Sequence, residues 1–104
     1  MLYTDVDAPY DFAIMTSVLE RTVRVPDDVV FRELQGEAVI RNLASSMYFG
    51  LDPGGTRIWR LCETQGSLKS VLDAMQEEFD APRETLQAVL LAFVDELTAK
   101  GLLA

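Results

Sequence analysis

The chain has 104 residues, 49% of them hydrophobic, which suits one ordinary domain with its own core. Its formal net charge of −8 argues against DNA or RNA as the main partner, because phosphate binding rests on a basic surface. With no histidine and a single cysteine, Cys62, it cannot assemble a zinc site of the usual nitrogen and sulfur ligands, or a Ser-His-Asp or Cys-His arrangement. A carboxylate-only site remains conceivable, but we expect no enzyme activity, no metal and no cofactor.

The compartment is expected to be the cytoplasm, with no membrane attachment. No apolar stretch reaches the roughly 18 residues of a membrane span. The N-terminal residues lack the basic and apolar regions of a secretory signal. A lone cysteine excludes an internal disulfide and fits a reducing compartment.

Residues 1–27 allow two interpretations. Apolar residues at helical spacing suit a short helix over about residues 10–20, whereas the alternation of residues 19–25 suits a strand. We leave both open. We expect residues 1–22 to be an N-terminal extension and residues 23–104 to be the folded domain.

Two strands joined by a tight hairpin are predicted next. Residues 29–34 are rich in β-branched and aromatic side chains, and residues 37–43 alternate between two faces. Gln35 and Gly36 separate the two runs, and two residues ending in glycine are typical of a tight turn.

A third strand is predicted over residues 46–51, after a turn at Ala44 and Ser45. In a meander it is an edge strand, and it carries no lysine or proline of the kind that normally guards an edge. A peptide that adds as a further strand is one interpretation. Self-pairing in a homodimer, or cover by residues 1–25, are the others.

Three helices are predicted in the rest of the chain. Asp52 is a good N-cap for the first, which ends at Gly66, and Ser67 caps the second. Residues 80–82 break the chain before the third helix, and Gly101 ends it. Trp59 and Cys62 are expected in the core. A sheet of three antiparallel strands followed by three helices is an α+β fold, here resembling a winged helix-turn-helix with the sheet first.

The third helix has a wider apolar arc than a two-layer core needs. The predicted core face consists of Leu86, Val89, Leu90, Phe93 and Leu97. Leu91 and Val94 are expected beside this face, with Gln87 and Thr98 next to them. This shoulder either lines an external groove or packs against the N-terminal segment or a second copy of the chain. If the shoulder lines a groove, we expect Leu91→Asp or Val94→Arg to abolish peptide binding and to leave the fold intact.

Several short segments, in this order and spacing, resemble the PqqD-like family, whose members act as recognition elements for ribosomally made, post-translationally modified peptides. The segments are residues 29–34, 36–40 and 48–52, Gly55, Ile58-Trp59, and residues 93–97 and 100–103. The resemblance covers about residues 23–103. It departs at Asp52-Pro53, where asparagine and a residue other than proline are usual, and in the longer N-terminal extension.

The resemblance implies a domain without catalysis that captures the leader segment of a precursor peptide. The leader adds to the third strand, lies against the third helix, and is handed to a separate enzyme such as a radical SAM protein, a cyclase or a leader protease. Pyrroloquinoline quinone synthesis is one possible pathway. The implied peptide-binding residues are Ser46, Met47, Tyr48, Phe49, Gly50, Gln87, Leu91, Val94, Asp95 and Thr98. Asp95 and nearby carboxylates suit basic leader residues.

Two other functions compete with peptide capture. A winged-helix regulator needs a basic recognition helix, but the second helix holds only Lys69 against Asp73, Glu77 and Glu78, which counts strongly against it. A structural or dimerisation subunit of a biosynthetic complex is compatible with the sequence.

Overall fold

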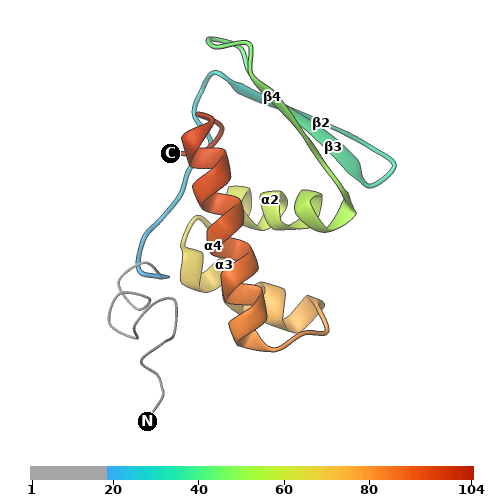
Figure 1. The fold of residues 1–104 in the computed structure, drawn as a ribbon, viewed down its shortest axis with the longest axis vertical. Coiled ribbons are helices and arrows are strands. Elements are labelled where there is room, and N and C mark those ends of the chain that lie inside the picture. Colours follow the sequence, from blue (N-terminus) through green and yellow to red (C-terminus); the bar gives the residue numbers. More distant parts are fainter. Residues whose placement is uncertain (1–18) are drawn as a thin grey trace.

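A computed structural model describes residues 19–104, which form a sheet followed by helices (Figure 1). The elements are β2 (Val29–Leu34), β3 (Glu37–Asn42), β4 (Tyr48–Leu51), α2 (Pro53–Gln65), α3 (Leu68–Glu78) and α4 (Arg83–Ala99). The sheet has three strands in the order β2-β3-β4, with both pairs antiparallel. The predicted α+β fold, with an antiparallel sheet before three helices, is therefore confirmed.

The β2–β3 hairpin turns at the predicted residues. Gln35 and Gly36 have φ angles of 57° and 83°, so both adopt the left-handed conformation that a two-residue hairpin turn requires. The register pairs Leu34 with Glu37 and Phe31 with Ile40. Because side chains alternate between the two faces of a strand, this register places Phe31 and Ile40 together on the face that meets the helices.

The β3–β4 connection is longer than predicted, and the third strand begins at Tyr48 instead of Ser46. The Asn42 side chain organises this turn, since its Oδ1 accepts hydrogen bonds from the backbone N–H groups of Ala44 and Ser45. Ser46 has a φ angle of 65°, which no strand residue adopts. The prediction that Ser46 and Met47 belong to the strand is therefore wrong.

The helices begin and end at the predicted caps. Asp52 Oδ1 accepts a hydrogen bond from Gly55 N at 2.7 Å and so caps α2, with Pro53 in the first turn. A side chain at Gly55 would meet Leu51 at 3.3 Å, so this glycine lets the helix start directly against the end of β4. The Ser67 side chain caps α3, and Gly101, with a φ angle of 74°, follows the end of α4.

The core lies between the inner face of the sheet and the helices. Trp59 is fully buried and stacks on Phe31, with ring centroids 6.0 Å apart. Cys62 is also buried, so the expectation that both residues are core is confirmed. The buried apolar residues form one cluster that draws on β2, β3, β4 and all three helices.

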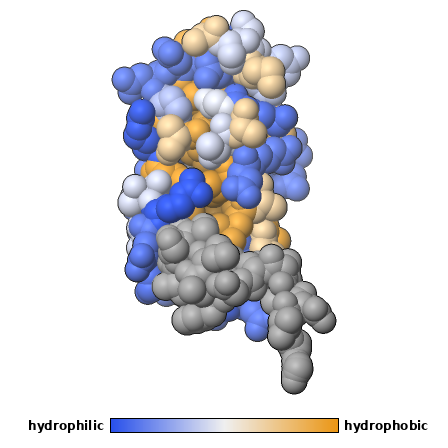
Figure 2. Space-filling view, turned by 60° about the vertical axis from the view of Figure 1, so that its left-hand side comes forward, coloured by the Kyte–Doolittle hydropathy of each residue, from blue (hydrophilic) through white to orange (hydrophobic). Residues whose placement is uncertain are grey.

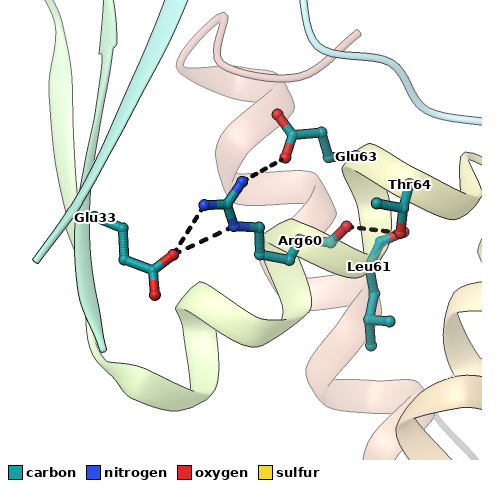
Figure 3. Close-up of polar contacts among 5 residues, drawn as sticks. All are labelled: Glu33, Arg60, Leu61, Glu63 and Thr64. Atoms are coloured by element: carbon teal, nitrogen blue, oxygen red, sulfur yellow. Dashed lines mark hydrogen bonds and ion pairs between the residues drawn. The ribbon is translucent and has the colours of Figure 1, made fainter. Parts of the chain in front are cut away.

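Arg60 ties the β2–β3 hairpin to α2 (Figure 3). Its guanidinium binds Glu33 of β2 with Nη2 to Oε1 at 3.0 Å, and Glu63 of its own helix at 3.2 Å. The same group lies over the Phe31 ring, 4.3 Å from the centroid. The hydrogen bond with Glu33 raises the pKa of Arg60. The guanidinium thus holds the sheet and α2 together at the surface, above the stacked rings.

The segment before β2 runs along the helices as an irregular chain. Val23 N donates to Gly66 O, and the backbone groups of Arg24 and Ala104 exchange two hydrogen bonds. The strand considered for residues 19–25 is not formed, because this segment makes only an isolated bridge from Thr22 to Ser67. Most of the helix considered over residues 10–20 lies outside the described residues. The domain boundary after residue 22 stays a prediction.

The surface mixes apolar and hydrophilic regions. On the face shown in Figure 2, apolar surface runs down the middle of the domain between margins of hydrophilic side chains. Hydrophilic side chains border this apolar surface, and some of them lie over it. Among the described helices, none combines the length and apolar character that crossing a bilayer requires.

Candidate functional site

Strand β4 presents a free edge. Within residues 19–104 it has a strand neighbour only on the β3 side. Asn42 N donates to Met47 O at 2.8 Å, so Asn42 and Met47 form a hydrogen-bonded pair of the β3–β4 ladder. By the register, the next such pairs are Ile40 with Phe49 and Ala38 with Leu51. Because such pairs alternate in an antiparallel ladder, the N–H and C=O groups of Tyr48 and Gly50 point away from β3, toward the open edge.

The side chains of β4 alternate between the two faces of the sheet. Phe49 and Leu51 point inward and pack with the core cluster. Tyr48 is 70% exposed on the outer face. A Cβ added at Gly50 would meet nothing within 4 Å, so the backbone is openly accessible there. As far as residues 19–104 are concerned, nothing covers the strand at Gly50.

An apolar cavity of about 700 Å³ opens where β4 passes into α2. Residues of three segments line it: Asp52, Gly54, Gly55 and Ile58 around the start of α2; Met75, Phe79, Asp80 and Ala81 at the end of α3; and Thr85, Leu86, Val89, Ala92, Phe93 and Glu96 from α4. Its volume lies in the range of pockets that take small ligands or parts of larger ones.

The open edge of β4 and the cavity belong to one continuous region. Asp52 and Gly55, on the cavity wall, follow β4 directly in the chain. At the other end of the strand, Lys100 Nζ lies 5.6 Å from the centroid of the Phe49 ring. The end of α4 thus contacts β4 at Lys100, and the same flank of the helix, through Glu96 and Val89, forms part of the cavity wall.

Helix α4 is rotated relative to the sequence prediction. Its buried residues are Leu86, Leu90, Val94 and Leu97. Val94 is 1% exposed, whereas Val89 is 46% exposed and lines the cavity. The expectation that Val94 lies beside the core face is therefore wrong, as is the placement of Val89 within it. Val94→Arg would place a charge in the core, so this variant cannot test binding.

The other α4 residues predicted for the site lie away from the cavity. At about 100° per residue, Gln87, Leu91 and Thr98 fall on the flank of α4 opposite Val89. Leu91 is partly buried against the core, while Asp95 and Thr98 are exposed. None of the predicted helix residues lines the cavity, and sequence reasoning missed Thr85, Ala92 and Glu96. The available signal was the spacing of Val89, Ala92 and Phe93, which fits a second apolar stripe.

The groups that this region offers are apolar side chains and carboxylates. Among the described residues, no group of three or more His, Cys, Asp or Glu side chains is placed to hold a metal ion. Burial raises the pKa of the Cys62 thiol to about 12, which keeps it protonated near neutral pH. The cavity wall offers apolar contacts and the carboxylates of Asp52, Asp80 and Glu96.

Fold and site together define a small α+β domain in which an open edge strand and one helix flank border an apolar cavity. The family model for coenzyme PQQ synthesis protein D (PqqD) matches residues 37–103, which is more than half of the chain. The chain belongs to the PqqD family, as the sequence segments indicated.

Two solved structures are similar to this chain. TbiB1, solved in complex with the TbiA(beta) leader peptide, is 35% identical and superposes with a TM-score of 0.73, covering 77% of this chain and 93% of TbiB1. A lasso peptide synthetase B1, complexed with the leader peptide, is 17% identical with a TM-score of 0.71, covering 80% of this chain and 98% of the other. This second likeness concerns the fold. A search of curated proteins finds no match.

Proposed function

We propose that this protein binds the leader segment of a ribosomally made precursor peptide on the edge of β4 and presents it to a separate modifying enzyme. The free edge of β4 beside the apolar cavity is the observation that carries the proposal. TbiB1, the 35% identical relative, was solved with a leader peptide bound, and this supports the proposal.

The bound segment forms a further strand of the sheet. Its main chain pairs with the outward N–H and C=O groups of Tyr48 and Gly50, which gives affinity for an extended peptide of any sequence. Alternate side chains of the guest then point to the side of the sheet on which Phe49 lies. These side chains meet the flank of α4 that carries Val89 and Phe93, and the cavity beyond it. The pockets on that flank give sequence specificity.

The proposed site keeps the strand residues expected from sequence and changes the helix residues. Tyr48, Phe49 and Gly50 form its edge, and Ser46 and Met47 lie in the turn that precedes it. On α4, the residues of the cavity wall replace Gln87, Leu91, Val94, Asp95 and Thr98.

The protein acts without chemistry of its own and hands the peptide to an enzyme that modifies or cleaves it. A radical SAM protein, a cyclase or a leader protease would suit this role. The proposal places the pair in the cytoplasm, where precursor peptides are made. The identity of the enzyme follows from the precursor and its modification.

Calorimetric titration tests the proposal. The purified protein is titrated with the leader half of each short precursor encoded beside its gene, and with the TbiA(beta) leader peptide as a reference probe. We expect saturable one-to-one binding of at least one of these peptides. A folded protein that binds none of them overturns the proposal.

Gly50→Pro locates the binding edge. Proline removes the outward N–H of residue 50, which the β3 ladder does not use, so the fold survives and main-chain pairing with the guest is lost. Gly50→Ala is the matched control, because its Cβ enters open space and keeps the N–H. We expect Gly50→Pro to lose binding and Gly50→Ala to retain it.

A self-paired dimer is the competing use of the same edge. Light scattering of the free protein measures its mass in solution and so distinguishes a self-paired dimer from a monomer with a free edge. A stable dimer that Gly50→Pro converts to a monomer, with no peptide bound by either form, would replace peptide capture by a structural role.

A further inference from the structure

The cavity beside β4 is apolar inside and carries only carboxylates among its charged groups. Its deeper wall includes Ile58, Met75 and Phe93, and its charged lining residues are Asp52, Asp80 and Glu96. Among the residues that the structure describes, no lysine or arginine lines it. The nearest cation along α4, Lys100, lies one turn beyond Glu96, over the ring of Phe49.

Some acidic side chains of the described residues are paired with arginine: Glu78 binds Arg57, Glu33 binds Arg60 and Asp73 binds Arg83. Asp80 and Glu96 have no such ion pair within residues 19–104. Asp52 uses one oxygen to cap α2. Within residues 19–104, the cavity therefore combines an apolar interior with negative charge at its edge.

We infer that the cavity selects guest peptides with an apolar side chain and a lysine or arginine two positions apart, the apolar group entering the cavity and the cation meeting Glu96. This inference rests on the proposed function and specifies its ligand. The spacing follows from strand geometry, because side chains on one face of a strand recur every second residue, roughly 6.5 to 7 Å apart.

A display selection tests this specificity without knowledge of the natural precursor. A library of random twelve-residue peptides is selected on the immobilised full chain, and the enriched peptides are sequenced. We expect Lys or Arg to be enriched two positions from a Leu, Ile, Phe, Tyr or Met. For a consensus peptide, replacing the basic residue with Gln should weaken binding roughly two- to fivefold, as for exposed ion pairs.

Charge reversal at the cavity is the decisive variant. Glu96→Lys should shift the enriched residue at that position from basic to acidic. Asp95→Lys is the matched control, because Asp95 is the neighbouring exposed residue of the same helix, does not line the cavity, and changes the net charge equally. The control should leave the basic preference in place.

The outcomes separate this inference from the function on which it rests. If no peptide is enriched on the folded protein, the proposed function itself fails. If Gly50→Pro abolishes enrichment but enriched peptides show no basic preference, peptide capture stands and the charge rule is wrong. If Glu96→Lys and Asp95→Lys reduce the preference equally, the preference reflects net charge, and the role given to Glu96 is overturned.

Discussion

Lys100 lies over the ring of Phe49, with its ammonium nitrogen 5.6 Å from the ring centroid, and so joins the end of α4 to the edge strand β4. The contact lies at one end of the proposed site, where α4 meets β4. A cation over an aromatic ring at a partly exposed position contributes about 0.5–1 kcal/mol. The contact between Lys100 and Phe49 is therefore weak, and it joins α4 to β4 only at this end of the site.

A double-mutant cycle measures this contact. Lys100→Gln and Phe49→Leu are made singly and together, and the free energy of unfolding is taken from urea titrations. We expect a coupling of about 0.5–1 kcal/mol between the two positions. A coupling indistinguishable from zero would mean that Lys100 is only a solvated end of the helix.

Val94→Arg should prevent folding. Val94 is 1% exposed within the core cluster, so an arginine there leaves an unpaired charge without solvent. Val94→Ala should fold and lose roughly 1–3 kcal/mol of unfolding free energy. Circular dichroism and urea titration check both. A folded, stable Val94→Arg protein would contradict the placement of α4.

Val89→Arg and Thr98→Arg compare the two flanks of α4. Both residues are exposed, so both variants should fold. Val89 lines the cavity, and an arginine there blocks it, so leader affinity should fall tenfold or more. Thr98 lies on the opposite flank, and its variant should bind within about twofold of the wild type. If Thr98→Arg weakened binding and Val89→Arg did not, the peptide would bind the flank of α4 that the sequence predicted, which carries Thr98.

The Arg57–Glu78 ion pair makes part of the stability depend on pH. Its two hydrogen bonds, at 2.5 and 2.6 Å, lower the pKa of Glu78 below its ordinary value of 4.5. The stabilisation is therefore fully present above pH 4.5 and is lost as the pH falls through the lowered value. Because both side chains are well exposed, it amounts to at most about 1 kcal/mol.

Arg57→Gln tests this assignment. Urea titration at pH 7 should find the variant less stable than the wild type, and the difference should shrink at pH 3. A difference that persists at pH 3 would indicate that Arg57 acts through packing and not through the charge of Glu78.

Cys62 should react with thiol reagents only after unfolding. Its pKa of about 12 and its burial leave little thiolate and no access at pH 8. We expect labelling to be slow in buffer and fast in urea, at rates that follow the population of opened protein. Rapid labelling of the native protein would show that α2 opens locally.

Much of the fold follows from short-range rules in the sequence. Gln35 and Gly36 fix the hairpin because only a few residues accept two successive left-handed angles. Asp52 and Ser67 mark the helix starts through side-chain hydrogen bonds to backbone groups three residues on. Such signals are local, and local signals can be read without knowledge of the rest of the chain.

The positions of the site residues depend on contacts between parts of the chain that are far apart in sequence. The start of β4 is set by Asn42, whose side chain holds the turn and also donates to Gly101 O at 2.8 Å, 59 positions away. On α4, apolar residues cover so wide an arc that several core faces fit the spacing. Which flank meets β4 is decided by how α2 and α3 place the helix. The edge strand was therefore predictable, and its facing helix residues were not.

Trp59 gives the protein a built-in optical reporter. It is the only tryptophan of the chain, is fully buried, and stacks on Phe31 where the sheet meets α2. Its fluorescence in the native state should be blue-shifted, and it should move to longer wavelength when water reaches the indole. Emission at this one position therefore reports separation of the sheet from the helices, and stopped-flow recordings can follow that separation in time without any attached dye.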